Sequence, residues 1–600
     1  MGRSRLRGRP RSPHRFDPQT VLTGTASRKL PAQTKSRMVM VWSILMFGIL
    51  LLSLNLLRIQ VIQAPMLREQ AKAQQMIATN AAAPRRTIVD RTNDVLAIDR
   101  PVYTLFVHPI MFKETQETIA ADLAPLVNQP VGALLEKFKQ GETGIRIADT
   151  LTEDAANRIR ELHLDGLDLT QEQQRLYPQQ DLFAGIVGFV NQDRQGMGGV
   201  ELTQEEILKR PDSAMQLNRS GDGSIIPIDL PEGFLQKDEQ LLKLTVDSRL
   251  QRATQSFVQK QVEAYNAKRG TVLVMDITDG SLMAMASEPS FDPNKYYEAK
   301  PEALKDWVLT DLYEPGSTFK PVNVAIALES GAVQATDTFY DEGAIEVDGW
   351  PIQNNDFESE GGRGTLTIAE ILKYSSNIGM VHMMHQLQSG LYYGWLERLG
   401  LGQESGVDLP GESAGQTKTY AQFTGSPIEP ATTAFGQGFS LTPMKLLQLH
   451  ATIANGGKLI TPHVVQGLYS PDGKQTWQPQ RPVPRQIFSR QVSQEVMQMM
   501  EEVVSDGTGK TAQIANYRIA GKTGTAQKAD PSGGYIDGAR ITSFVGIFPA
   551  DKPRYAVLAV FDEPQGENAF GGTVAAPVVK SVMETLITLE KIPPSVAVTP

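Results

Sequence analysis

The stretch Tyr313-Glu314-Pro315-Gly316-Ser317-Thr318-Phe319-Lys320 decides how the rest of the chain is read, and a largely apolar run follows it. The Pro-Gly pair breaks the chain, which predicts a turn that delivers Ser317 to the first turn of a buried helix. Lys320 lies three residues on and falls on the same helix face. A serine becomes a good nucleophile when a base takes its proton, and burial can lower the pKa of an amine from about 10.4 towards about 7–8, where it can be that base. The helix N-terminus would favour negative charge developing beside Ser317.

Ser-x-x-Lys alone is a weak motif, because it arises by chance in a chain of 600 residues and also fits a solvated helix start. A second motif, Ser375-Ser376-Asn377, follows a helical stretch at Leu366–Tyr374 and is expected in a loop between helices. The hydroxyl of Ser375 could pass a proton from base to leaving group, and Asn377 offers a donor and an acceptor to a substrate amide. Taken alone, this tripeptide also fits a polar helix cap.

A third motif, Lys522-Thr523-Gly524-Thr525, is expected to end a strand that begins at Tyr517. Lys522 and the hydroxyls of Thr523 and Thr525 could hold a substrate carboxylate, and Gly524 would let the backbone approach a ligand closely. A backbone N–H here and that of Ser317 could form an oxyanion hole. The alternative is an ordinary strand that runs into a turn.

Composition limits the classes of protein that the chain can belong to. Six hundred residues suggest two or three domains, and the lack of cysteine excludes disulfides, thiolate catalysis and Cys-ligated zinc. Residues 1–37 hold eight Arg and two Lys against one Asp, a formal charge of +9, so the remainder of this chain of net charge −9 carries −18. Such an acidic body is a poor candidate for nucleic-acid binding.

Met38–Leu57 is an apolar stretch of twenty residues without a charge, bounded by Arg37 and Arg58. At 1.5 Å per residue a helix of this length spans about 30 Å, the thickness of a bilayer core. The length of the run, the long tail before it and the lack of an Ala-x-Ala site just after it favour a membrane anchor over a cleaved signal peptide. By the positive-inside rule the basic tail stays in the cytoplasm and the chain after Arg58 is exported.

After the anchor we expect a non-catalytic spacer, beginning with a polar helix at Gln63–Met76, and then an α/β domain. In that domain two strands surround Asp279-Gly280, a strong hairpin signal, and further strands lie near the C-terminus. Strands at both ends with helices between them indicate one sheet built from both pieces. The expected bounds are 1–37 for the basic tail, 38–57 for the anchor, 58–238 for the spacer, 239–590 for the catalytic domain and 591–600 for a C-terminal tail.

Histidine gives little support to another mechanism, since none of the seven neighbours the three motifs in sequence. His382 and His385 lie one turn apart on an expected helix and could ligate a metal, although such a pair is more often packed or solvated. A Ser-His-Asp triad is not excluded, but nothing points to one. The sequence has no phosphate-binding Gly loop and no dinucleotide fingerprint.

In this order and on these elements, the three motifs resemble those of the penicillin-recognising serine enzymes, and their flanks are similar to the class B (monofunctional) penicillin-binding proteins. The similarity covers nearly everything after the basic tail. It is carried by Leu244–Asp247, Ala286–Pro289, Phe291–Asn294, Glu314–Lys320, Gly436–Gly438, Asn455–Gly457, Ala520–Ala526 and Phe544–Gly546, and in the spacer by Arg86–Ala97, Arg175–Pro178 and Gly188–Glu201. The resemblance implies an α/β fold: a serine β-lactamase/transpeptidase-like domain, with a central antiparallel sheet flanked by helices, on an N-terminal α+β pedestal with one transmembrane helix.

The resemblance also implies a peptidoglycan DD-transpeptidase that penicillins inhibit. Ser317 would attack the penultimate D-alanine carbonyl of a stem pentapeptide, with Lys320 as general base, and an amine of a neighbouring stem would then close the cross-link. Ser375 would relay the proton, and Asn377 would orient the substrate. Lys522, Thr523 and Thr525 would bind the terminal carboxylate, with Gly524 between them, and the N–H groups of Ser317 and Thr525 would form the oxyanion hole.

The basic tail and the stretch Gly188–Asp193 resemble the division (septal) type more than the elongation type. This resemblance implies other division proteins as partners, among them a glycan polymerase of the SEDS family that meets the Met38–Leu57 helix. It places the chain in the inner membrane with its catalytic domain in the periplasm, and it implies no metal, no cofactor and no nucleic acid. The pedestal departs from the family at Thr87 and Asn93, where glycines are usual, and at Gly185, where a histidine is frequent.

Three alternatives stay open beside a septal transpeptidase. The first is an elongation-type transpeptidase. The second is a hydrolase, either a β-lactamase or a DD-carboxypeptidase, which shares the three motifs but needs a positioned water for deacylation. The third is a non-catalytic penicillin-binding scaffold or sensor, in which we would expect one motif to be eroded, whereas all three are intact.

Overall fold

The computed structural model describes residues 32–67, 76–79, 83–210, 215–219, 225–226, 239–530 and 533–595. The described residues fall into two compact units, one within 1–79 and 214–231 and the other within 80–213 and 232–600. Residues 1–31 of the expected basic tail and residues 596–600 of the expected C-terminal tail lie outside the described residues. The domain bounds expected from the sequence stay a prediction.

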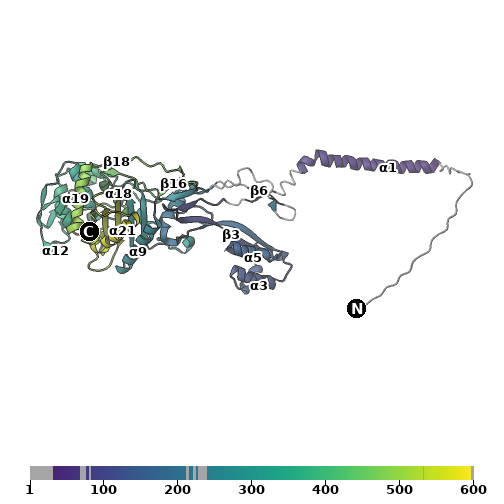
Figure 1. The fold of residues 1–600 in the computed structure, drawn as a ribbon, viewed down its shortest axis with the longest axis horizontal. Helices are drawn as coiled ribbons and strands as arrows, with labels where there is room; N and C mark the ends of the chain where they lie inside the picture. The colour runs from purple at the N-terminus through teal and green to yellow at the C-terminus, as the bar shows by residue number, and fades with distance from the viewer. Residues whose placement is uncertain are drawn as a thin grey trace, which may run out of the picture. The chain divides into compact units, whose positions relative to one another are not determined.

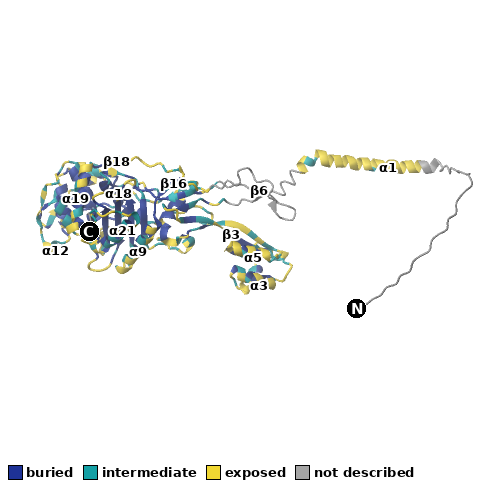
Figure 2. Ribbon diagram, in the orientation of Figure 1, coloured by how far each residue is buried: buried dark blue, intermediate teal, exposed yellow. Residues whose placement is uncertain are grey.

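The first unit contains the expected anchor. Helix α1 (Ala32–Leu57) continues into a π-helical turn at Arg58–Ile62, and the span Ser36–Ile62 is long and apolar enough to cross a membrane. From Met38 onward the large apolar residues of this helix are exposed, and Figure 2 shows most of its ribbon in the colour of exposed residues; a bilayer is the environment that would cover them.

The expected polar helix at Gln63–Met76 is only partly present. Residues 64–67 are helical and residues 68–75 lie outside the described residues. Met76 instead opens strand β1 (Met76–Thr79), which pairs antiparallel with β6 (Met215–Arg219), and β6 pairs with β7 (Ile225–Ile226). The helix prediction was therefore wrong at Met76, because pairing with a segment about 140 residues away leaves no signal in the local sequence.

The N-terminal part of the second unit is built on a long strand, β3 (Val95–Val107), which pairs antiparallel with β5 from Ile98 to Val107. The sheet has the order β17-β16-β8-β2-β3-β4, with β5 on β3. Its other strands are β2 (Thr87–Val89), β4 (Ile145–Leu151), β5 (Leu167–Leu176), β8 (Leu241–Leu244), β16 (Val465–Tyr469) and β17 (Gln475–Trp477). Helices α3 (Gln116–Val127), α4 (Val131–Phe138) and α5 (Glu153–Glu161) share an apolar cluster with β3 and β4 (Figure 1).

A buried ion cluster joins the pedestal stretches Arg175–Pro178 and Gly188–Glu201 to Arg85 and Asp99, which flank the stretch Arg86–Ala97. The carboxylate of Glu201 is fully buried and accepts hydrogen bonds from Arg85 at 2.8 Å and Arg175 at 2.6 Å. Arg175 also contacts Asp99 at 3.1 Å, and Asp99 contacts Arg194 at 2.6 Å. Because a buried charge without a partner is costly, these pairs make the stretches depend on one another.

An antiparallel sheet of order β10-β9-β21-β20-β19 forms the centre of the C-terminal part. Its strands are β9 (Arg269–Asp276), β10 (Leu282–Glu288), β19 (Ala520–Ala529), β20 (Tyr535–Phe548) and β21 (Tyr555–Asp562). The hairpin at Asp279-Gly280 and the sheet drawn from both ends of the domain are confirmed. Side chains alternate between the faces, so that Val272 and Val274 join one apolar cluster while Leu273 and Met275 join the other.

Helices cover both faces of this sheet (Figure 1). Helices α9 (Ser248–Ala264) and α21 (Ala576–Glu590) pack on one face, so the stretch Gly571–Glu590, although apolar enough for a membrane span, is a partly buried helix of the domain. On the other face lie α11 (Lys320–Glu329), which is buried except at Glu329, and α18 (Pro443–Ala454), in which every residue is buried. The region expected to hold only helices and loops also contains short ribbons: β11 (Thr338–Asp341) with β14 (Gly364–Thr367), and β12 (Ala344–Val347) with β13 (Trp350–Gln353).

Candidate active site

Ser317 sits in a 3₁₀ turn, η6 (Gly316–Phe319), immediately before α11. The expectation that it lies in the first turn of the α-helix was therefore wrong by one turn. Residues three apart are eclipsed in a 3₁₀ helix, so Lys320 still follows Ser317 on the same side. Gly316 has φ 54°, a conformation that favours glycine, and its N–H donates to the carbonyl of Gly436 at 2.9 Å.

The second motif joins two helices, as expected. Ser375 ends α13 (Ile368–Tyr374) in the left-handed conformation, with φ 60°, and Asn377 is the first residue of α14 (Asn377–Met384). The expected helix at Leu366–Tyr374 begins two residues later, because Leu366 pairs with Phe339 in the β11–β14 ribbon. A non-glycine residue held at positive φ stores strain of about 1–3 kcal/mol, which surrounding contacts must maintain.

Lys320 points from α11 at this second motif. Its Nζ donates to the Oδ1 of Asn377 at 2.8 Å and lies 3.3 Å from the Oγ of Ser375, whose carbonyl it also contacts. Ser317 keeps 8% of its surface exposed, whereas Lys320 is fully buried. Both residues are therefore buried, and the nucleophile candidate retains only a small exposed surface while the amine beside it has none.

The third motif lies inside strand β19, so the expectation that it ends a strand was wrong. Long pairing with β20 carries the strand on to Ala529, with Lys522 opposite Val545. The Nζ of Lys522 donates to the Oγ of Ser375 at 2.9 Å and to the carbonyl of Thr523 at 3.1 Å. The Oγ of Ser375 therefore lies within hydrogen-bonding distance of both lysines.

Strand β19 also packs against the turn that carries Ser317. Among the described residues β19 is at the edge of its sheet. A Cβ added at Gly524 would lie 2.8 Å from the Cγ2 of Thr318 and 3.2 Å from the carbonyl of Pro315, so only glycine permits this approach. The structure therefore brings Ser317, Lys320, Ser375, Asn377 and the Lys522–Thr525 motif together.

The two threonines of this motif have separate partners. The Oγ1 of Thr523 lies 2.8 Å from that of Thr508, and the Oγ1 of Thr525 accepts from the N–H of Gly571 at 3.2 Å. Each hydroxyl keeps a lone pair or proton available for a ligand.

Burial shifts the protonation of both lysines towards the neutral amine. It lowers the pKa of Lys522 to about 7. Burial also lowers the pKa of Lys320 well below its ordinary value, and the cation of Lys522 lowers that pKa further, against the opposing effect of Asp356 and Asp341. Near neutral pH such amines can accept a proton, which is what activation of a serine hydroxyl requires.

The sequence reading missed a polar network beneath the second motif. Both carboxylate oxygens of Asp341, which is fully buried, accept from the side-chain amide of Asn354 at 2.9 Å. The Oδ1 of Asn354 in turn accepts from the backbone N–H of Asn377 at 2.7 Å. The network orients Asn377 from the end of β11 and the residue after β13, and such four-residue strands are too short to leave a periodic signal in the sequence.

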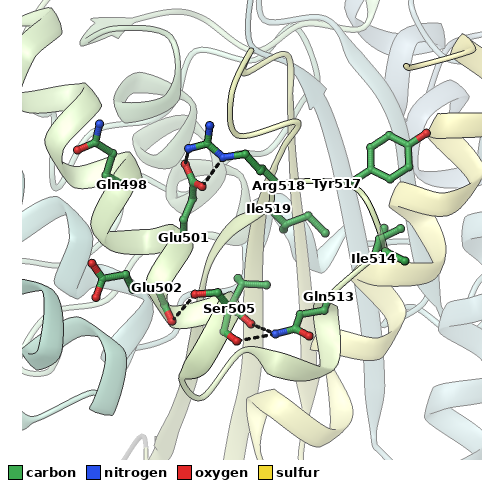
Figure 3. Close-up of a pocket in the computed structure, with 11 residues that line it drawn as sticks. Gln498, Glu501, Glu502, Ser505, Gln513, Ile514, Tyr517, Arg518 and Ile519 are labelled. Carbon is green, nitrogen blue, oxygen red and sulfur yellow. Dashed lines mark hydrogen bonds and ion pairs between the residues drawn. The ribbon is translucent and has the colours of Figure 1, made fainter. Parts of the chain in front are cut away.

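Among the histidines of the described residues, His450 contacts the Ser317 turn, whereas His382 has a partner away from the three motifs. His382 lies 3.0 Å from Glu342, and within the described parts of the chain no group of three metal-ligating side chains is assembled. A hollow of about 660 Å³ is lined by α19 (Arg490–Asp506) and the segment before β19, where Arg518 pairs with Glu501 (Figure 3). None of the motif residues lines that hollow.

This fold and this site together define the class of penicillin-recognising serine enzymes. The match is specific, because the family described as "Penicillin binding protein transpeptidase domain" matches residues 270–584 and "Penicillin-binding Protein dimerisation domain" matches residues 80–228. The chain belongs to the penicillin-binding protein transpeptidase family. The expected resemblance to class B members of the division type, and the expected fold class, are confirmed.

Similar proteins come from several organisms. The chain is 39% identical to a "Peptidoglycan D,D-transpeptidase FtsI homolog" of Mesostigma viride, over 94% of this chain and 97% of the relative. It is 30% identical to "Peptidoglycan D,D-transpeptidase FtsI" of Escherichia coli, over 92% and 93%. A crystal structure of penicillin binding protein 3 of Mycobacterium tuberculosis, complexed with aztreonam, has a TM-score of 0.64 and 26% identity, over 87% of this chain and 100% of that one.

Proposed function

We propose that this chain is a peptidoglycan D,D-transpeptidase that cross-links stem peptides through an acyl-enzyme on Ser317, in septal wall synthesis. The observation that carries the proposal is the shared hydroxyl of Ser375, which lies 2.9 Å from Lys522 and 3.3 Å from Lys320 beside the Ser317 turn. The printed activity of the relatives, peptidoglycan D,D-transpeptidase, supports the substrate class.

In the acylation step, neutral Lys320 takes the proton of Ser317 while the Oγ attacks the penultimate D-alanine carbonyl. A neutral amine has two N–H donors and one lone pair; bonds to two of its oxygen neighbours leave the lone pair for the serine. The N–H groups of Ser317 and Thr525 stabilise the oxyanion, for which one donor contributes about 2.7–4 kcal/mol. The proton then passes through Ser375 to the amine of the departing D-alanine.

Substrate binding and the second half-reaction use the same groups. Lys522, Thr523 and Thr525 hold the terminal carboxylate of the stem, Gly524 allows its close approach, and Asn377 hydrogen-bonds the substrate amide. An amine of a neighbouring stem attacks the ester carbonyl, Lys320 accepts its proton, and Ser317 leaves with a proton returned to its oxygen. β-Lactams, which mimic the stem terminus, acylate Ser317 in the same way and block it.

We further propose the membrane arrangement and partners that the sequence resemblance implies. The charge of +9 in residues 1–37 supports a cytoplasmic N-terminus and an extracytoplasmic catalytic part. The α1 span would then meet a SEDS-family glycan polymerase and other division proteins in the plasma membrane.

Fluorescent-penicillin labelling tests the proposal directly. The wild-type chain should take up one label, and Ser317→Ala should take up none while it remains folded. The adduct should persist for minutes or longer; rapid turnover would instead favour a β-lactamase. Normal cross-linking in cells that carry only Ser317→Ala would favour a scaffold, and a tagged chain confined to the lateral wall would favour the elongation type.

A further inference from the structure

His450 lies on the buried helix α18, far in sequence from the three motifs, and its ring contacts the Ser317 turn. Its Nε2 lies 2.8 Å from the carbonyl oxygen of Thr318. A carbonyl oxygen only accepts, so Nε2 carries the proton and donates. Burial lowers the pKa of His450 to about 4, and the cation of Lys522 also acts to lower it, so the ring is neutral at physiological pH.

The Thr318 carbonyl lacks its 3₁₀ donor because of the residue that follows Lys320. In the 3₁₀ turn the N–H of Lys320 donates to the carbonyl of Ser317. The next bond of that series would run from residue 321 to Thr318, but residue 321 is proline and has no N–H. His450 supplies the donor that Pro321 cannot.

The hydrogen bond from His450 is one of three contacts that hold Thr318, the residue next to Ser317 in the turn before α11, which carries Lys320. The hydroxyl of Thr318 donates to the carbonyl of Pro315 at 2.7 Å, and its methyl group packs against β19 at Gly524. The peptide units on either side of Thr318 set the direction of the turn. A change in the orientation of the Thr318 carbonyl would therefore change how Ser317 presents its hydroxyl and N–H.

We propose that His450 is a positioning residue for acylation: its Nε2–H holds the Thr318 carbonyl and so fixes how Ser317 presents its hydroxyl and N–H to substrate. This role rests on the proposed function, since it acts through Ser317. The Nδ1 of the same ring is buried without a hydrogen-bond partner among the described residues. An apolar side chain would avoid that unsatisfied atom, which supports the single N–H donor as the reason for an imidazole here.

The test replaces His450 in the full-length chain by side chains of similar size that either carry or lack an N–H donor. His450→Met keeps the volume and removes the donor, whereas His450→Gln keeps an N–H at a similar reach. Adding Pro321→Ala to His450→Met returns a backbone N–H at residue 321. For each protein we would titrate the reactive serine with fluorescent penicillin, then measure per active site the limiting acylation rate and the penicillin concentration at half that rate, together with Tm.

We expect His450→Met to lower the limiting acylation rate about tenfold, the effect of one hydrogen bond, with the half-saturating concentration unchanged. His450→Gln should recover to within about threefold of wild type, and the Pro321→Ala addition should recover part of the loss. A role in core packing alone would lower Tm and the number of reactive sites without changing the rate per site. Equal rates in His450→Met and wild type, or equal losses in the Met and Gln variants, would overturn the proposal.

A second measurement needs no change in the active chain. In protein labelled with ¹⁵N-histidine, the His450 signals, assigned by their loss in His450→Gln, should report a neutral ring protonated at Nε2 from pH 5 to 8. A ring protonated at Nδ1, or a charged ring at pH 7, would overturn the proposal even if His450→Met does not fold. If wild type itself takes up no penicillin at Ser317, the proposed function fails and this role fails with it, an outcome distinct from equal labelling of the variants.

Discussion

Removing the hydroxyl of Ser375 tests the central contact of the site, because this oxygen lies near both buried amines. Ser375→Ala keeps the left-handed backbone of the C-cap about equally strained, since serine and alanine both carry a Cβ. It deletes the acceptor 2.9 Å from Lys522 and 3.3 Å from Lys320. The nearest remaining partner of Lys522 is the Thr523 carbonyl at 3.1 Å, which cannot relay a proton.

The size of the effect follows from the charge on these contacts. A hydrogen bond to a charged group contributes about 1.5–3 kcal/mol, and about 1.4 kcal/mol is a factor of ten in rate. We therefore expect the second-order rate constant for acylation by fluorescent penicillin to fall by between about tenfold and about 150-fold. Stopped-flow or gel-based labelling at 20 °C, normalised to titrated sites, measures this constant.

Ser376→Ala is the matched control in the next position. The Oγ of Ser376 accepts from the N–H of Gly379 at 2.8 Å and caps α14. Its loss should cost about 1 kcal/mol of stability and leave the acylation rate per site near wild type. The reasoning is refuted if Ser375→Ala acylates within twofold of wild type, or if both variants slow equally.

Three further predictions concern charge, shape and the pedestal. Burial lowers the pKa of Lys522 to about 7 in the folded chain, so between pH 7 and 10.5 the unfolded chain binds more protons at this residue and the stability of the fold rises with pH. The gain in Tm of Lys522→Met over wild type should therefore be largest at pH 7 and shrink towards pH 10. A gain that stays constant with pH would contradict the burial of Lys522. Gly436→Ala would place a Cβ 2.0 Å from the carbonyl of Gly316 at φ 87° and should reduce acylation at least about tenfold, whereas Gly425→Ala, with no atom within 4 Å of the new Cβ, should leave labelling unchanged. Glu201→Gln leaves Arg85 and Arg175 without their shared carboxylate, so chemical denaturation should show a free energy of unfolding lower by about 3–5 kcal/mol, while the folded fraction acylates at the wild-type rate. An unchanged denaturation midpoint would show that the ion cluster contributes little to stability.

The three motifs were predictable because each depends on neighbours in sequence: a Pro-Gly turn before an apolar helix, a polar pair between helices, and a glycine in a strand. Their meeting in one site depends on the order of the sheet strands and the packing of the helices, which only the family resemblance implied. The expectation that Lys522–Thr525 ends a strand was wrong for a similar reason. Pairing with β20 extends β19 to Ala529, and a local reading cannot see a partner strand.

The supporting residues were not predictable from local pattern. Asn354 reaches Asn377 from a ribbon 23 residues away, and His450 reaches Thr318 across 132 residues. One signal was present in the sequence, since Pro321 removes a backbone donor from the turn at Ser317 and leaves room for one from elsewhere. It does not say where that donor comes from, because this depends on the packing of α18 beneath the turn.

The sheet that contains β2, β8 and β16 takes strands from both the pedestal and the catalytic part, so the two parts depend on each other to fold. β2 pairs with β3 on one side and, in parallel, with β8 on the other, and β8 pairs in turn with β16 from far down the chain. The carboxylate of Asp90, just after β2, accepts from the N–H of Ser248 at the start of α9 at 2.9 Å. If the pedestal of one relative were joined to the catalytic part of another, strands β2 and β8 would come from different proteins and their pairing would be disrupted. A working chimaera must therefore take β2 and β8 from the same parent.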